Sequence, residues 1–107
     1  MIIRSAILEG TVQEAAQPRF DAHMRDVVVP AIGTYPGIRT VTLRKIAEKD
    51  DGAPSLYMIF DLYFDSIEAM NAALASETRT AVREKIKEGM GDFEGRVYHV
   101  VFDVAVG

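Results

Sequence analysis

The stretch SLYMIFDLYF, residues Ser55–Phe64, decides the fold of this chain. Side chains alternate across a β-strand, so every second residue of the stretch shares a face. One face is wholly apolar and predicts contact with a hydrophobic layer: Leu56, Met58, Phe60, Leu62 and Phe64. The other face is too apolar to lie in water and too polar for a plain core: Ser55, Tyr57, Ile59, Asp61 and Tyr63. We therefore expect a strand with two differently covered faces, and the second face is a candidate for function.

Three further segments have the composition of strands. They are Ile2–Glu9, which Gly10 and Thr11 should end, Ile38–Ala47, and Arg96–Val106. A polar loop containing Asp51 and Gly52 joins the second of these to Ser55–Phe64 as a hairpin. The chain thus predicts four strands.

Two helical segments separate the strands. The first runs from about Pro18 to Thr34, and Pro30 should kink its last turn. The second is split into a helix capped by Asp65 or Ser66 and a piece from about Glu77 to Glu88, followed by a mobile glycine-rich loop around Met90. The order βαββαβ is the ferredoxin-like α+β pattern, a four-stranded antiparallel sheet with the helices on one face. We expect one such domain over residues 1–107.

The composition excludes several classes of function. A hydrophobic content of 49% and a charged content of 26% are typical of a globular domain, and the net charge of −4 gives no footprint for nucleic acid. No run has transmembrane length and the start lacks a secretory pattern, so we expect a soluble cytoplasmic protein without membrane contact. There is no cysteine, the two histidines are far apart, and no phosphate-binding or Gly-x-Ser-x-Gly motif occurs. The sequence therefore predicts no dedicated zinc site and no phosphate-binding loop.

The helix-free face of the predicted sheet should form a dimer. It would carry Tyr57, Ile59 and Tyr63 with apolar neighbours, and monomers rarely expose so large an apolar patch. Packing two such faces together would bury the patch. The pattern therefore predicts a two-fold homodimer whose sheets form a shared barrel.

Four segments resemble a known family. FDAHMR at residues 20–25, VPA at 29–31, YPGIR at 35–39 and FDLYFDSIEAMNAAL at 60–74 are similar to EthD-like dimeric α+β barrel proteins. The small size and the MIIRSAILEG start are most similar to HapK/RedY-like members, which occur with pigment and bisindole biosynthesis genes. The resemblance implies monooxygenase, isomerase or cyclase chemistry without metal or bound cofactor, or no activity. It carries over the helix histidine His23, but Val27 and Val28 stand where some relatives have a second one.

The two histidines each have a catalytic and a structural interpretation. His23 lies on the flank of the apolar helix stripe, where an imidazole can exchange a proton near neutral pH. Alternatively, it is a half-buried histidine bonded to a backbone carbonyl. His99 shares a strand face with Val97 and Val101, and if that face lines the barrel it is a cavity acid or base, or an interface hydrogen-bond partner.

Asp61 and Tyr57 complete the candidate catalytic set. A carboxylate in mid-strand is costly unless paired, and Arg4, Arg39 or Arg44 could pair with Asp61 and make it structural. Unpaired, its pKa would rise and it could act as a base. The Tyr57 phenol could donate to an oxyanion or stack on an aromatic ligand, or simply pack at the interface.

Three functional hypotheses follow. The first is a cofactor-free enzyme that hydrates, cyclises, isomerises or oxygenates a small apolar aromatic intermediate, with His23, Tyr57, Asp61 and His99 as its catalytic residues. The second is a carrier that binds such an intermediate without turnover. The third is an interaction module whose polar residues only hold the dimer together. His23 and Asp61 should lie on opposite sides of the sheet, so they share a pocket only at an open edge.

Overall fold

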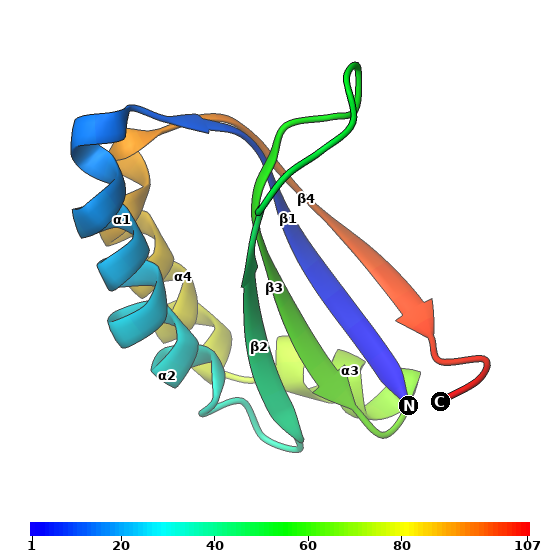
Figure 1. The fold of residues 1–107 in the computed structure, drawn as a ribbon. Helices are drawn as coiled ribbons and strands as arrows, with labels where there is room; N and C mark the ends of the chain where they lie inside the picture. The colour runs from blue at the N-terminus through cyan, green and yellow to red at the C-terminus, as the bar shows by residue number, and fades with distance from the viewer.

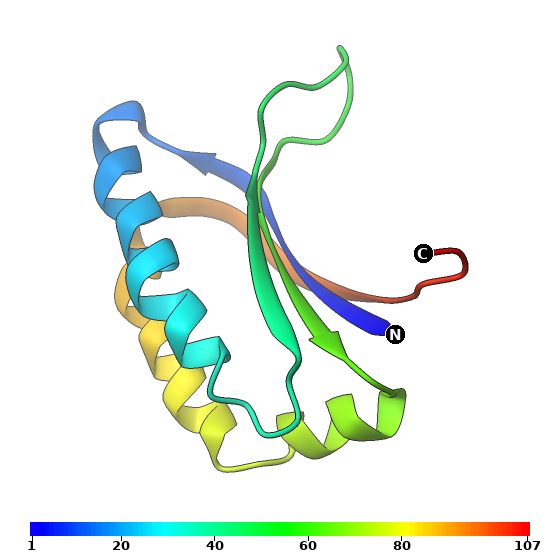
Figure 2. The ribbon, with the colours of Figure 1, turned by 60° about the horizontal axis from the view of Figure 1, so that its bottom comes forward.

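The computed structural model describes the whole chain, residues 1–107, and confirms the ferredoxin-like α+β fold. Four antiparallel strands form one sheet in the order β2-β3-β1-β4. Their bounds are β1 (Ile2–Val12), β2 (Thr40–Lys45), β3 (Leu56–Phe64) and β4 (Phe93–Asp103). All helices lie on one side of the sheet and leave the other side bare (Figures 1 and 2). No helix is long and apolar enough to cross a membrane.

The first helical segment is interrupted. It comprises a 3-10 turn (Glu14–Ala16), α1 (Gln17–His23), a π-helical turn (Met24–Val28) and α2 (Val29–Ile32). Pro30 has no N–H to donate, and the expected disturbance takes the form of the π-helical turn before it. The buried stripe follows four-residue spacing: Phe20, Met24, Val28 and Ile32.

The second helical segment consists of α3 (Ile67–Leu74) and α4 (Thr78–Gly89). Of the two predicted caps, Ser66 is the one used, because its Oγ accepts a hydrogen bond of 3.1 Å from the backbone N–H of Ala69. Asp65 pairs with Arg39 instead. The prediction of a mobile loop around Met90 is wrong, since a 3-10 turn (Met90–Asp92) leads directly into β4.

The pairing of β1 with β4 extends past the predicted end of β1 and the predicted start of β4, because two glycines allow a close approach, whereas β4 ends at Asp103 and not at the predicted Val106. Gly10 and Thr11 were expected to end β1, but Gly10 pairs with Gly95 and β1 continues to Val12. A Cβ on Gly10 would lie 2.1 Å from the carbonyl oxygen of Glu94, and Gly95 has a φ of 150°. Only glycine fits these two positions without displacing the partner strand.

The core lies between β1, β3 and the helices. Met58, Phe60, Leu62 and Phe64 of β3 are all buried, as predicted, and pack with Phe20 and its stripe. Fully burying an aliphatic or aromatic side chain contributes about 1.5–3 kcal/mol, so this layer accounts for much of the stability. On the bare side Val100 and Phe102 of β4 remain exposed. The fold thus separates a dry helix-facing side from an open side.

Candidate functional site

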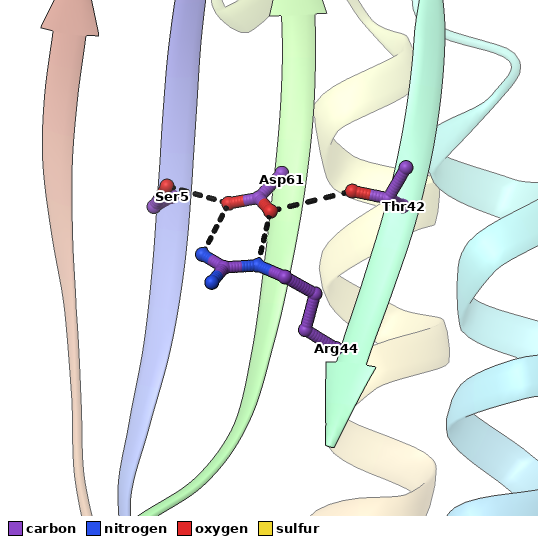
Figure 3. Close-up of polar contacts among 4 residues, drawn as sticks. All are labelled: Ser5, Thr42, Arg44 and Asp61. Atoms are coloured by element: carbon purple, nitrogen blue, oxygen red, sulfur yellow. Dashed lines mark hydrogen bonds and ion pairs between the residues drawn. The ribbon is translucent and has the colours of Figure 1, made fainter. Parts of the chain in front are cut away.

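Asp61 sits at the centre of a matched polar network on the open side of the sheet (Figure 3). Its carboxylate accepts two hydrogen bonds from Arg44, of 2.6 and 3.2 Å, and one of 2.6 Å from the hydroxyl of Ser5. Thr42 donates a fourth at 3.3 Å. Asp61 and Ser5 are buried although no helix covers this side, because the Arg44 side chain extends across them.

This network keeps Asp61 ionised. Burial by itself would raise the pKa of the Asp61 carboxyl, but the hydrogen bonds from Arg44 and Ser5 outweigh it and hold the pKa below its ordinary value. A carboxylate with a lowered pKa and four donors is a poor proton acceptor. Of the two sequence interpretations, the geometry matches the structural one, with Arg44 as the partner.

Tyr57 does not share the face of Asp61, contrary to the expected alternation. Leu8 pairs with Met58 and Glu9 with Leu56, so Tyr57 is an extra residue in β3, a β-bulge. The bulge turns Tyr57 toward the helices, where its ring meets that of Phe20 edge-on with 5.6 Å between the centroids. Strict period-two alternation placed Tyr57 on the open face, and that placement was wrong.

The Tyr57 phenol is held by helix α1. Its hydroxyl donates a hydrogen bond of 2.6 Å to Asp21, which also forms an ion pair with Lys45. Burial, with the hydrogen bond to Asp21, raises the pKa of Tyr57. The hydroxyl is therefore a neutral donor that is already used within the protein.

His23 joins α1 to α4. Its Nε2 lies 2.7 Å from the backbone carbonyl oxygen of Lys85, which can only accept, so Nε2 carries the hydrogen. The ring lies over Gly89, where an added Cβ would come 2.3 Å from His23 Cδ2. This is the carbonyl-bonded histidine of the structural interpretation, and Gly89 leaves the space for it.

His99 lies on the helix-facing side, not on the side that would line a barrel. It pairs with Ala6 in register, and Ala6 shares its face with Arg4 and Leu8 of the core layer. The imidazole keeps an exposed edge, but burial and the charges of Arg4 and Arg79 lower its pKa. These causes favour the neutral imidazole, which is the form that can act as a base.

Around His99 the structure gathers residues that the sequence analysis did not connect. Arg4 is half-buried on β1, and burial together with the charge of Arg79 lowers its pKa. Tyr35, after α2, is buried, and burial raises the pKa of its phenol although nearby arginines oppose the shift. We call Arg4, Tyr35, Arg79 and His99 the cationic cluster. The available sequence signal was Arg4 itself, a charge on the helix-facing side of a central strand.

The four predicted catalytic residues therefore do not form one site. Asp61 lies on the open side, as the predicted separation from His23 required. On the helix side, Tyr57 and His23 are bonded to Asp21 and to Lys85 respectively. His99 alone sits beside unpaired charge. No group of three histidine or carboxylate side chains is placed to hold a metal ion.

Two hollows lie away from the cluster, near the long β2–β3 loop and the start of β4. One of about 280 Å³ is bordered by Val12, Ile46 and Tyr57, and one of about 190 Å³ by Thr11, Arg19 and Asp92. In the smaller one Arg19 and Asp92 neutralise each other through two hydrogen bonds. Neither contains an unpaired titratable group beside a neutral base, so neither competes with the cluster.

Comparisons with known proteins identify the fold. No protein-family model and no curated protein sequence matches the chain. Among solved structures, an ethyl tert-butyl ether D (EthD) family protein from Bacillus halodurans C-125 has a TM-score of 0.75 and 17% identity, covering 96% of this chain and 98% of its own. SnoaB, a cofactor-independent oxygenase from Streptomyces nogalater, has a TM-score of 0.65 and 12% identity over 99% and 94%. At3g17210 from Arabidopsis thaliana has a TM-score of 0.69 and 10% identity over 96% and 94%. The chain thus has the α+β fold of these EthD-like and oxygenase structures.

Proposed function

We propose that this protein is a small cofactor-independent enzyme that acts on an apolar aromatic intermediate by acid/base chemistry. The proposal rests on the position of His99, which pairs with Ala6 on the helix-facing side of the sheet, where burial and the charges of Arg4 and Arg79 lower its pKa. The neutral imidazole is the form that can act as a general base near neutral pH. His99 thereby takes the role that the resemblance gave to His23, whose Nε2 is bonded to the Lys85 carbonyl.

The chemistry begins with a proton transfer. Neutral His99 accepts a proton from an O–H or an acidic C–H of the substrate, and the negative charge that develops lies next to Arg4 and Arg79. The Tyr35 hydroxyl is a further donor at the cluster. The imidazolium that forms can return the proton to another substrate atom, which completes an isomerisation or a cyclisation. Hydration or oxygenation of the substrate anion would start from the same step.

The resemblance supplies the biological setting. HapK/RedY-like proteins belong to pigment and bisindole biosynthesis, and SnoaB, of the same fold, is a cofactor-independent oxygenase. We place this chain with such enzymes of secondary metabolism. A substrate of that class is mostly apolar, which suits a site beside the hydrophobic core.

We also propose that the protein works as a homodimer through its open sheet face. Val100 and Phe102 are exposed there beside the Asp61 network, with no covering element from the chain itself. Sedimentation velocity at micromolar concentration should give a dimer, and Phe102→Glu should give a monomer. Val106→Glu, outside the sheet at a side chain that is 93% exposed, is the matched control. A monomeric native protein contradicts this part of the proposal.

The enzyme proposal is tested on aromatic intermediates suggested by the neighbouring genes. We expect turnover to fall by about a hundredfold or more in His99→Gln, which removes the base. His23→Gln is the matched control because its side-chain amide can still donate to Lys85, and it should retain most of the activity. Tight binding without turnover would instead indicate a carrier. Loss of turnover in His23→Gln but not in His99→Gln, with folding intact, would return the base to His23.

A further inference from the structure

The arginines of this protein fall into two groups. Five of the eight form ion pairs with carboxylates: Arg19–Asp92, Arg25–Asp26, Arg39–Asp65, Arg44–Asp61 and Arg96–Glu9. Arg4, Arg79 and Arg83 form none, and these three are the cations whose charges act on buried Tyr35. The chain has a net charge of −4, so carboxylates are not scarce. These three arginines nevertheless form no ion pair with any of them. Their position is the unusual feature.

One of these arginines, Arg4, is destabilising where it stands. Arg4 is half-buried beside Arg79, and both burial and the like charge lower the pKa of Arg4. Leaving a charge partly buried without a counter-ion is unfavourable, and no carboxylate of the protein forms an ion pair with Arg4. Arg79 has only a long contact of 3.5 Å from Nη1 to the Leu74 carbonyl oxygen, so most of its five donors are free. A guanidinium group with free donors can form paired hydrogen bonds to a carboxylate.

An apolar surface adjoins these cations. Val97 and Val101 flank His99 on the same face of β4, and they remain 45% and 39% exposed although they lie on the helix-facing side. Val101 pairs directly with Arg4 across the two strands. A ligand that meets both groups has an anionic end and a flat or bulky apolar body.

We propose that Arg4 and Arg79 bind the carboxylate of an aromatic acid, whose apolar body lies along Val97 and Val101. Arg83 strengthens the positive potential from the next turn of α4. This inference rests on the proposed function in taking the ligand as the substrate, and it specifies that substrate as an anion. A bound carboxylate also supplies the negative charge that the cluster lacks, so ligand binding stabilises the fold.

The test uses two probes of nearly equal shape, 2-naphthoate and 2-naphthamide, titrated by NMR or calorimetry. The native protein should bind the naphthoate about tenfold or more tightly, because charge-assisted hydrogen bonds are worth more than neutral ones. Arg4→Gln and Arg79→Gln should each abolish that preference and leave naphthamide binding within about twofold. Arg79→Lys should retain part of the preference for naphthoate, since lysine keeps the positive charge but lacks the planar guanidinium group that forms two parallel hydrogen bonds.

Arg25→Gln is the matched control, because it removes the same charge from an exposed arginine paired with Asp26. It should leave both affinities unchanged. Equal affinity for the two probes, or no binding of either, contradicts the anion site. If Arg25→Gln lowers the affinity for naphthoate as much as Arg79→Gln does, the preference reflects only the overall charge of the protein, which also contradicts the site. The enzyme proposal is judged separately by turnover in His99→Gln. If both probes bind equally and the enzyme turns over substrate, the substrate is neutral and only the anion site is wrong. If naphthoate binds selectively and no turnover is found, the protein binds aromatic acids without catalysis.

Discussion

The two faces of the sheet treat charge in opposite ways. On the open face, the Asp61 carboxylate meets Arg44, Ser5 and Thr42, so each charge has its partner within the protein. On the helix face, the charge of Arg79 opposes that of Arg4 near His99, and neither arginine forms an ion pair with a carboxylate. A network whose charges are all paired within the protein needs no ligand, so its role is structural. An unmatched one leaves its charges available to a ligand.

The largest expected effect comes from breaking the matched face. Asp61→Ala leaves the buried Ser5 hydroxyl without its partner and frees the Arg44 guanidinium, so the free energy of unfolding should fall by about 2–3 kcal/mol. Urea unfolding followed by circular dichroism measures it. Asp26→Ala removes a carboxylate from an exposed ion pair and should leave the free energy of unfolding nearly unchanged. Equal effects in the two variants would remove the contrast between network and surface pair.

The Asp61 network also has a pH signature. The pKa of Asp61 is lower in the folded state, so its contribution to stability is present above the ordinary value of 3.8 and is lost as the pH falls toward the folded value. The acid limb of the stability curve should therefore flatten in Asp61→Asn. An unchanged acid limb would contradict the lowered pKa.

A smaller effect separates His23 from the cluster on its own side of the sheet. Gly89→Ala places a Cβ 2.3 Å from the His23 ring, and the repacking cost should exceed the gain in helix propensity by about 1 kcal/mol. Gly91→Ala is the control, since nothing lies within 4 Å of its Cβ position. The double variant Gly89→Ala with His23→Ala should show strong coupling in a double-mutant cycle. Additive effects would mean that His23 does not occupy the space above Gly89.

Breaking the unmatched face should have the opposite sign. Arg4→Gln removes a half-buried charge beside Arg79, so the unfolding free energy should stay unchanged or rise by up to about 1 kcal/mol. The same urea experiment measures this. A loss as large as that in Asp61→Ala would show that Arg4 has a structural partner, and the comparison between the faces would fail.

Sequence reasoning predicted the fold because the signals were local and periodic. Alternation in Met58–Phe64 and four-residue spacing from Phe20 to Ile32 fix which sides are dry, and the element order then fixes the topology. Errors arose where one residue altered the period or the pairing. The bulge at Tyr57 reversed its face, and the Gly10–Gly95 pairing extended β1 beyond its expected end and moved the start of β4 ahead of Arg96.

The candidate site was harder to predict because it depends on long-range register. His99 could be assigned to a face with Val97 and Val101, but only pairing with β1 shows that this face meets the helices. Tyr35 and Arg79 reach the same place from α2 and α4, across contacts that no spacing in the sequence encodes. The pairing of Asp61 with Arg44 could be anticipated from the sequence, since Arg44 was one of three candidate partners. The unpaired arginines become visible only once the other five have been paired.

The finest test of the comparison is the titration of His99. Its folded pKa lies below the ordinary 6.5 because of burial and the charges of Arg4 and Arg79. As the pH falls through 6.5, the unfolded chain takes up the proton before the folded one, so the contribution of His99 to stability declines toward acid and is restored above 6.5. Imidazole NMR shifts should show the lowered pKa directly, and Arg79→Gln should raise it because a repelling charge is gone. Arg25→Gln, in the π-helical turn after α1, should leave it unchanged. If Arg79→Gln leaves the His99 pKa unchanged, as Arg25→Gln should, the cations lie too far from the imidazole to stabilise an anion formed beside it. That result would contradict the proposal that the reaction takes place on the helix-facing side.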